Sequence, residues 1–390
     1  MLKINMKSAA NLVKGQGVGS CYDEQVALMK SSDDFLVSEN GRGKYDIIHY
    51  HTVNPGYYLD RLMRKKSTVG IGYVHFLPNT LDESLRLPIL FRKVFYKYLL
   101  KFYSSMDYLV TVNPYFVEEI RGYGINAPKV VCIPNFVDSE KFYPVSPDEV
   151  RKGRESLGLD LDKFIVLGVG QLQTRKGIVD FVETAKRLPD VQFIWAGGFS
   201  FGKITDGYDI IRKMVKNPPD NIKFLGIVDR KEMPLVYSIA DMMFLPSYDE
   251  LFPMSILEAL CCKKPVMVRD IPLYDDILFD YCLRGSNAEQ FAQIVSRLAG
   301  SADECMQWQN RSWQCHILYT KESAMRQWTT FYHTAYCQFM SGRAGNAIGG
   351  KDIELKGIPQ ESINHGSDIN RDVLHMSKKI RTVRVDRINK

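Results

Sequence analysis

The strongest constraint on the fold is an alternation of short apolar segments with helical segments, which the chain repeats in two halves. The first half places strand-like segments at residues 3–6, 45–51, 68–74, 108–112 and 130–133. Residues 144–162 hold two prolines, many charges and a helical piece, and we interpret them as the linker to a second domain. The alternation then restarts at residues 164–168, 192–196, 222–225, 242–245 and 266–268. Strands that alternate with helices favour parallel sheets with helical crossovers. We therefore predict an α/β fold of two Rossmann-like domains, residues 1–145 and 146–320, facing a central cleft.

The remaining segments are assigned from periodicity and turn residues. Helices are expected up to residue 29 and at residues 85–103, 177–188, 233–238, 253–262 and 289–299, whereas Asn-Pro-Gly at 54–56 is expected to form a turn. Residues 303–340 look helical and amphipathic, and their last part, 321–340, could cross back to the first domain. Residues 341–390 begin with a Gly-, Ala- and Asn-rich stretch and show little periodicity, so we expect a weakly ordered basic tail.

Composition argues against several protein classes. No uninterrupted apolar run reaches 18 residues, so no bilayer-spanning helix is expected. The N-terminus lacks the apolar core of a secretory leader. The eight cysteines are spread along the chain without a CxxC pair, which favours free thiols over disulfides or a zinc site. We therefore expect a globular protein of the cytoplasm with free cysteines.

The net charge of +6 is concentrated in two segments. Residues 61–101 carry nine Lys or Arg and two acids, which gives +7, and residues 378–390 carry +5. The rest of the chain therefore has a net charge of −6. Concentrated positive charge predicts an anionic partner, which could be nucleic acid or a membrane surface.

The basic segment contains an amphipathic helix. At about 100° per residue, six apolar side chains of residues 88–103 fall within an arc of about 140°, and cations occupy the opposite half. We expect the membrane-binding residues to be Arg92, Lys93, Phe95, Lys97 and Lys101. A basic face beside an aromatic-rich apolar face is typical of an interfacial helix on anionic lipid. The alternative is an ordinary helix with its apolar arc in the core; no fold signature supports nucleic-acid binding.

Two glutamates flank the start of a predicted helix near residue 253. Glu250 lies in the loop after a strand, Pro253 suits the first helical position, and Glu258 follows further into the helix. A helix N-terminus favours anions, so the two carboxylates could hold sugar-nucleotide hydroxyls while the helix faces phosphates. The alternative is a surface acid and an ordinary helix glutamate.

Other candidate site residues lie where strands end. Gly15, Gly17 and Gly19 permit a tight loop whose N–H groups approach a diphosphate, although a purely structural turn is also possible. Lys176 stands between a strand and a helix, where it could meet a phosphate or remain a solvated lysine. His75 follows another strand, where a polar contact to substrate competes with an ordinary loop histidine.

These motifs together resemble the retaining GT-B glycosyltransferases of the family-4 kind. Glu250 and Glu258 match the E-x7-E spacing of that family. Residues 168–177 (GVGQLQTRKG) resemble its G-R-L-x-x-x-K-G segment, and residues 133–138 (IPNFVD) resemble its I-P-N-G-V-D segment. The opening residues 4–20 are similar to bacterial diglycosyl-diacylglycerol synthases, which add a second hexose to monoglucosyl-diacylglycerol. The resemblance covers roughly residues 1–335.

The resemblance implies a donor, an acceptor and a role for each motif. The donor would be UDP-glucose or UDP-galactose, and the product would be an α-linked disaccharide on diacylglycerol. Glu250 would bind the donor hexose and Glu258 the ribose, while Arg175, Lys176 and the glycine loop would stabilise the diphosphate. His75 would act near the reacting sugar. No metal or other cofactor is expected, and the protein would work peripherally on the cytoplasmic face of the membrane, its N-terminal domain binding acceptor and lipid.

The chain departs from the family pattern at three positions. Gln171 stands where the family has arginine, and Arg175 could replace that charge. Lys264 precedes Pro265 where a glycine is usual, and Phe136 replaces another glycine. One alternative is a family-4 enzyme with another acceptor, such as an exopolysaccharide lipid carrier, which would share the donor half and differ in the N-terminal cleft. Another is a degenerate membrane-binding module, which the departures at Gln171 and Lys264 allow. A nicotinamide-dependent oxidoreductase would need a G-x-G-x-x-G turn, which we do not find.

Overall fold

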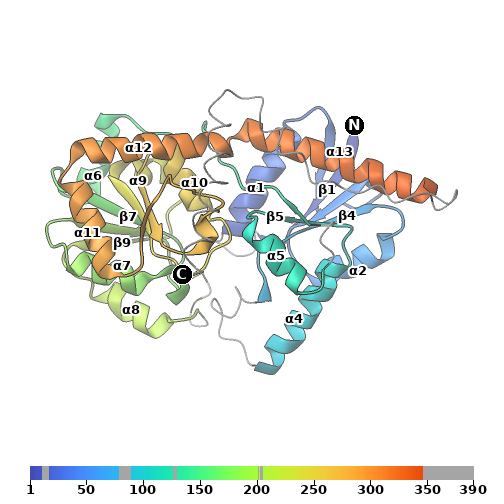
Figure 1. The fold of residues 1–390 in the computed structure, drawn as a ribbon, viewed down its shortest axis with the longest axis horizontal. Coiled ribbons are helices and arrows are strands. Elements are labelled where there is room, and N and C mark those ends of the chain that lie inside the picture. The colour runs from blue at the N-terminus through green and yellow to red at the C-terminus, as the bar shows by residue number, and fades with distance from the viewer. Residues whose placement is uncertain (11–16, 79–88, 126–129, 201, 203–204, 346–390) are drawn as a thin grey trace, which may run out of the picture. The chain divides into compact units, whose positions relative to one another are not determined.

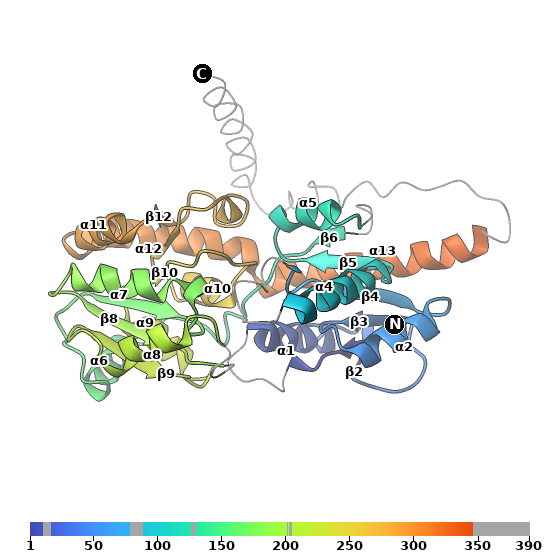
Figure 2. The same cartoon turned by 90° about the horizontal axis from the view of Figure 1, so that it is seen from below.

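Two six-stranded parallel sheets organise the described part of the chain (Figure 1, Figure 2). The computed structural model describes all residues except 11–16, 79–88, 126–129, 201, 203–204 and 346–390. Residues Met1–Ser341 form one compact unit, which contains both sheets.

The first sheet has the strand order β2-β1-β3-β4-β5-β6, with neighbouring strands parallel. Its strands are β1 (Leu2–Lys7), β2 (Phe35–Glu39), β3 (Ile47–Tyr50), β4 (Val69–Tyr73), β5 (Tyr108–Thr111) and β6 (Val130–Cys132). The helices of this half are α1 (Gly17–Lys30), α2 (Pro55–Arg64), α4 (Ile89–Ser104) and α5 (Tyr115–Gly122). Every residue of β3 and β4 is buried, as expected for a parallel sheet covered on both faces.

The second sheet has the order β12-β11-β10-β7-β8-β9, again parallel. Its strands are β7 (Ile165–Val169), β8 (Gln192–Ala196), β9 (Ile222–Gly226), β10 (Met242–Leu245), β11 (Val266–Arg269) and β12 (Leu283–Gly285). The helices are α6 (Pro147–Ser156), α7 (Ile178–Lys186), α8 (Tyr208–Lys216), α9 (Met233–Ile239), α10 (Met254–Cys261) and α11 (Ala288–Ala299). Strands β7 and β10 are neighbours, so the loops that follow them leave the same edge of the sheet.

Two helices complete the unit, α12 (Ala302–His316) and α13 (Lys321–Gly345). Helix α13 runs along the first half (Figure 1), where the Tyr332 hydroxyl lies 2.8 Å from His49 Nδ1 and Tyr108 donates to Gln338 at 2.8 Å. A 3-10 turn (Ile317–Tyr319) separates the two helices. The Tyr319 hydroxyl donates to the Ile277 carbonyl at 2.6 Å, which fixes this turn against the second half.

The prediction of an α/β fold with two parallel sheets is confirmed, with corrections to particular elements. Residues 54–56 do not form a turn: Asn54 is the N-cap of α2 and Pro55 begins that helix. The single helical stretch predicted for residues 303–340 is two helices. The sequence reasoning also missed the short elements β2, α5, α8 and β12. Within the predicted linker 144–162, a capping box between Ser146 and Glu149 starts the regular helix α6.

Two further observations concern the class of protein. None of the helices in the described ranges combines the length and the apolar character needed to cross a bilayer. All eight cysteines are free thiols, as predicted.

Candidate active site

The strongest candidate site lies where the loops after β7 and β10 meet. The first loop carries Arg175 and Lys176 in a 3-10 turn, and the second carries Glu250 ahead of α10. Lys176 Nζ forms an ion pair with Glu250 Oε1, and Arg175 Nη1 lies 3.5 Å from Glu250 Oε2. The side chains of Arg175, Lys176 and Glu250 are only 14%, 12% and 6% exposed. Three of the predicted site residues therefore form one nearly buried cluster.

Gly177 explains why the two loops can approach so closely. Its backbone is left-handed, with φ of 71°, and a Cβ at this position would lie 2.3 Å from the Pro246 carbonyl oxygen. The loops are also joined by a 2.9 Å hydrogen bond from the Tyr248 N–H to the Arg175 carbonyl. A glycine directly after Lys176 is thus required to bring the lysine to Glu250.

The cluster holds its charges through mutual pairing. Burial alone would raise the pKa of Glu250, but Lys176 and Arg175 together outweigh it and hold the pKa below its ordinary value. Burial lowers the pKa of Lys176, and the charge of Glu250 opposes that shift. The charge of Asp249 acts on Lys176 in the same direction as that of Glu250, so both carboxylates stabilise the charged lysine.

Glu258 lies in a second buried cluster with different partners. Its carboxylate accepts a hydrogen bond from the Tyr237 hydroxyl at 2.7 Å and pairs with Arg230 Nη1 at 3.1 Å. Arg230 Nη2 also lies 3.2 Å from Glu24 Oε1 on α1, and Lys141 Nζ lies 2.9 Å from the other Glu24 oxygen. Burial raises the pKa of Glu258 despite these partners. Arg230 therefore links a carboxylate of the second half to one of the first half.

Sequence reasoning missed most of this second cluster. Tyr237 begins residues 237–241 (YSIAD), which precede β10 and also resemble the family pattern, but Arg230 and Glu24 belong to no motif. The signal that was available for Glu24 is its position on α1, directly after the glycine-rich opening.

The predicted glycine loop is only partly described. Gly15 lies outside the described residues, Gly17 begins α1, and Gly19 lies in its first turn. Free N–H groups at the start of such a helix are suited to an anion. The expected role of the glycines in donor binding stays a prediction.

His75 belongs to a cluster of three histidines in the first half. It stacks on Tyr73 with 4.3 Å between ring centroids, and the His51 ring lies 5.7 Å away, with His49 a further 4.4 Å from His51. Burial lowers the pKa of His75 to about 3, and burial holds His49 and His51 well below their ordinary pKa as well. The three imidazoles are therefore neutral rather than cationic at neutral pH.

His49 and His75 differ in their exposure. His49 is fully buried, and its Nδ1 is 2.8 Å from the Tyr332 hydroxyl, the contact of an ordinary core histidine. Nε2 has no hydrogen-bond partner among the described residues in either histidine, but His75 is partly exposed. This difference favours His75 over His49 for contact with a substrate.

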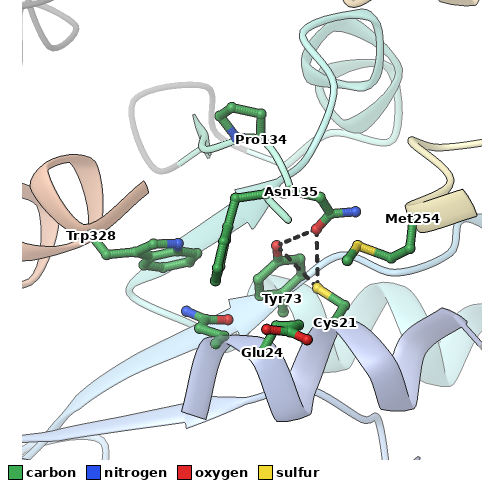
Figure 3. Close-up of a pocket in the computed structure, with 9 residues that line it drawn as sticks. Cys21, Glu24, Tyr73, Pro134, Asn135, Met254 and Trp328 are labelled. Carbon is green, nitrogen blue, oxygen red and sulfur yellow. Dashed lines mark hydrogen bonds between the residues drawn. The ribbon is translucent and has the colours of Figure 1, made fainter. Parts of the chain in front are cut away.

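Asn135 of the I-P-N segment joins the two halves (Figure 3). Its Oδ1 accepts hydrogen bonds from the Tyr73 hydroxyl at 3.2 Å and the Cys21 thiol at 3.0 Å, and its Nδ2 donates to the Phe252 carbonyl at 2.9 Å. Burial raises the pKa of Cys21 to about 12, so the thiol keeps its proton and can donate. The asparagine thereby ties β4 and α1 to the loop before α10, beside a small pocket that Figure 3 shows lined by Trp328.

The departures from the family pattern have structural explanations. Lys264 Nζ donates to the Ser238 and Ala240 carbonyls at 3.0 and 2.8 Å, which caps the end of α9. Lys263, rather than Lys264, adopts the left-handed backbone, with φ of 55°, that a glycine would adopt more easily. Gln171 Oε1 accepts from Gln173 Nε2 at 2.7 Å, while Arg175 occupies the cluster with Glu250. Gln171 lacks the charge of the family's arginine, and that Arg175 replaces this charge stays a prediction.

The predicted membrane-binding residues lie along α4. Lys93, Lys97 and Lys101 are exposed, whereas Arg92 and Phe95 are partly buried. Leu99 and Phe102 of the apolar arc are buried in the core. The core-helix alternative therefore holds for this part of the arc, and the exposed part of α4 is mainly its lysine row.

Among the described residues, no group of three or more His, Cys, Asp or Glu side chains is arranged to hold a metal ion. The cations Lys176 and Arg175 are the groups that this site offers to an anion.

Each half of the chain matches a family model of its own. Residues 149–313 match the family model described as glycosyl transferases group 1, and residues 28–141 match the model of glycosyltransferase family 4. The chain is 42% identical over 333 residues to the alpha-galactosylglucosyldiacylglycerol synthase of Streptococcus pneumoniae, covering 85% of this chain and 89% of that protein. It is 31% identical over 290 residues to the processive diacylglycerol alpha-glucosyltransferase of Acholeplasma laidlawii, covering 74% and 85%.

A solved structure supports the fold. Sucrose-phosphate synthase from Thermosynechococcus elongatus superposes with a TM-score of 0.72 at 18% identity, covering 87% of this chain and all of the other. Similarity at this level concerns the fold alone, and it agrees with the predicted GT-B arrangement of two Rossmann-like sheets.

Proposed function

The chain belongs to the family-4 glycosyltransferases, and we propose that it transfers a hexose from a UDP-sugar to glucosyl-diacylglycerol with retention of configuration. The observation that carries the proposal is the 42% identity, over 85% of the chain, to a synthase of alpha-galactosylglucosyldiacylglycerol. The product is then an α-linked diglycosyl-diacylglycerol. Galactose is the favoured hexose because it is named in that relative.

The cluster around Glu250 is proposed to hold the reacting part of the donor. Lys176 and Arg175 stabilise the negative charge that develops on the leaving diphosphate, and Glu250 binds hydroxyls of the donor hexose. Both cations are nearly buried, so their interaction with a phosphate is weakly screened by water. Glu258 binds the ribose hydroxyls.

The reaction needs little acid–base chemistry from the protein. The leaving diphosphate accepts the proton of the acceptor hydroxyl on the same face of the sugar, so the protein contributes positioning and electrostatic stabilisation. His75 is proposed to orient the reacting sugar through its neutral imidazole, which can donate one hydrogen bond and accept another.

The lipid acceptor places the enzyme at a membrane. We propose peripheral binding to the cytoplasmic face, with Lys93, Lys97 and Lys101 of α4 contacting anionic headgroups together with Arg92 and Phe95. Each Lys or Arg near such a surface contributes about 1 kcal/mol. The proposed division assigns the acceptor to the first half and the nucleotide sugar to the second.

A glucosyl donor is the second candidate, because the relative from Acholeplasma laidlawii is named as a glucosyltransferase. The two donors are distinguished by incubating the protein with glucosyl-diacylglycerol and radiolabelled UDP-galactose or UDP-glucose. We expect a labelled diglycosyl lipid from UDP-galactose, and none from either donor with the variants Lys176→Ala and Glu250→Ala. Lys216→Ala, an exposed lysine at the end of α8, is the matched control and should keep full activity.

The same assay separates the proposal from its alternatives. Transfer to a polyprenyl-linked saccharide but not to glucosyl-diacylglycerol would identify an enzyme with another acceptor. No transfer from either donor to any lipid would support a non-catalytic membrane-binding module and refute the proposal.

A further inference from the structure

Helix α2 exposes an apolar row that the protein core does not use. Leu59, Leu62 and Met63 are 59%, 45% and 79% exposed. At about 100° per residue the three side chains fall within an arc of about 100° on the helix. Three large apolar side chains gathered on one exposed helix face are unusual for a surface that meets only water.

The orientation of α2 is fixed by its opposite face. Arg61 is buried, pairs with Asp107 at 2.7 Å and donates from Nε to the Ser105 carbonyl at 2.9 Å. Asp60, the only acid of this helix, is paired with Lys7 at 3.0 Å and with Arg64 at 2.9 Å. The apolar row cannot turn inward without breaking these buried ion pairs.

The helix that carries the apolar row packs against α4, which carries the lysine row. Tyr58 of α2 and Tyr98 of α4 meet edge to face, with 5.8 Å between ring centroids, and the two helices lie next to each other in the first half (Figure 1). One helical turn from these tyrosines stand Leu62 on α2 and Val94 on α4, which are 45% and 61% exposed. Lys93, Lys97 and Lys101 border Val94 on the exposed side of α4.

Charge complementarity points to an anionic partner. Exposed lysines belong to the same part of the fold as the apolar row: Lys65 and Lys66 directly follow α2, and three more lie on the neighbouring helix α4. Helix α4 contains no acid. A second copy of this chain, docked through the same surface by a two-fold axis, would bring like charges together. An apolar row near cations suits the boundary between headgroups and acyl chains of an anionic bilayer.

We propose that α2 inserts Leu59, Leu62 and Met63 into the interface of a bilayer that contains anionic lipid, while the lysines of α4 contact the headgroups. The inference rests on the proposed function, in which the acceptor is a membrane lipid. It assigns the apolar part of membrane binding to α2, since Leu99 and Phe102 of α4 belong to the core.

The test is sedimentation of the full chain with vesicles of phosphatidylcholine alone or mixed equally with phosphatidylglycerol. The variant Leu59→Ser/Leu62→Ser/Met63→Ser should bind the mixed vesicles at least tenfold more weakly than the unsubstituted protein. Substituting glutamine for Lys93, Lys97 and Lys101 should weaken binding to mixed vesicles about fivefold per lysine and leave binding to phosphatidylcholine unchanged. The matched control is Ile210→Ser/Ile227→Ser, two exposed apolar residues of the second half, which should bind as before.

A second variant reports insertion directly. Leu62→Trp should show a blue-shifted difference spectrum, and quenching by brominated lipid, when mixed vesicles are added. Circular dichroism and the thermal midpoint show whether each variant is folded. An unshifted spectrum for Leu62→Trp, or equal vesicle binding by the triple serine variant and its control, overturns the proposal.

Two further measurements distinguish bilayer insertion from a contact between copies and from a failure of the proposed function. Sedimentation velocity that shows a dimer dissociated by the triple serine variant would identify the face as a contact between copies, and would overturn the lipid assignment. Transfer by the unsubstituted protein to a short-chain, water-soluble glucosyl-diacylglycerol tests the proposed function without a bilayer. Failure there refutes the proposed function, whereas success there with unaltered vesicle binding by the α2 variants refutes only the docking role of α2.

Discussion

Breaking the ion pair between Lys176 and Glu250 should separate its contribution to stability from its role in catalysis. Removing one partner of a buried ion pair leaves an uncompensated charge and costs about 3–5 kcal/mol. Lys176→Met leaves Glu250 with Arg175 at 3.5 Å, so we expect a cost near the lower limit, about 3 kcal/mol. Glu250→Gln leaves two cations next to each other without the carboxylate that pairs with both, so we expect about 5 kcal/mol.

The double variant Lys176→Met/Glu250→Gln removes the charges of both partners and leaves shapes close to the originals, while Arg175 keeps its hydrogen bond to the Asp249 carbonyl. Replacing a buried pair by neutral groups of similar volume is often neutral in stability. We therefore expect the free energy of unfolding of the double variant to lie within about 1 kcal/mol of that of the unsubstituted protein. Because the single substitutions each cost more than that, the two sites are then coupled by several kcal/mol. The assay is urea denaturation followed by circular dichroism, on all four proteins at one pH.

The pH dependence of the single variant Glu250→Gln provides an internal check. Burial already lowers the pKa of Lys176, and the loss of the Glu250 charge lowers it further. Between the pKa of Lys176 in the folded state and its pKa in the unfolded state, the unfolded state binds more protons, so stability rises with pH in that window. The destabilisation of Glu250→Gln should therefore shrink as the pH is raised from neutral towards about 10.

Activity should not follow stability across this set. All three variants should lose hexose transfer, because the donor site has lost a charge or a hydroxyl acceptor, even though the double variant is stable. If the double variant is as unstable as Glu250→Gln, the pair does not act as a unit and the electrostatic reasoning is wrong. If Lys176→Met transfers hexose at the original rate, the lysine has no role in the site.

Three further changes have definite expected outcomes. In Gly70→Ala the new Cβ would lie 2.5 Å from the Arg61 Nε, so the free energy of unfolding from thermal denaturation should fall by about 1–3 kcal/mol. In the control Gly56→Ala the new Cβ meets open space, so the protein should become slightly more stable. Arg230→Met should lower the free energy of urea unfolding by about 2 kcal/mol, because two buried carboxylates lose a shared cation that is itself a third exposed. The folded pKa of His75 is about 3, so below about pH 6.5 the unfolded state binds a proton that the folded state does not, and stability should fall as the pH drops. His75→Gln removes this group, and the slope of the urea-unfolding free energy against pH should decrease by about 1.4 kcal/mol per pH unit in that range.

Sequence patterns predicted the sheets well because parallel strands are buried on both faces. Strands β8 and β10 begin and end at the predicted residues, since an unbroken apolar run leaves little ambiguity about a buried strand. Helix α2 was missed because Asn-Pro-Gly is a turn signal, and the same asparagine and proline also suit a helix N-cap and first turn. The buried pairing of Arg61 with Asp107 favours the helix, and this contact joins residues too far apart in the sequence for a local pattern to reveal it.

The candidate site could be predicted only where its residues belong to local motifs. Lys176 and Glu250 each stand after a strand, and adjacent parallel strands bring such residues together at one edge of a sheet. Arg230 and Glu24 are 206 positions apart and belong to different halves, so no spacing in the sequence relates them. The role of Lys264 in capping α9 is likewise visible only in the fold, because its acceptors lie more than 20 residues away.

The charges of the two clusters support the proposed roles of their glutamates. Around Glu258, the buried carboxylates of Glu258 and Glu24 pair with two partly exposed cations, Arg230 and Lys141, which are 34% and 48% exposed. Ribose hydroxyls carry no charge, and their binding to Glu258 would leave that pairing intact. Around Glu250, the two cations Arg175 and Lys176 are only 14% and 12% exposed, so water screens their attraction for a diphosphate weakly. A diphosphate placed beside Glu258 instead would meet cations that water screens more strongly, so the burial of the cations favours the diphosphate at Lys176 and Arg175 and the ribose at Glu258.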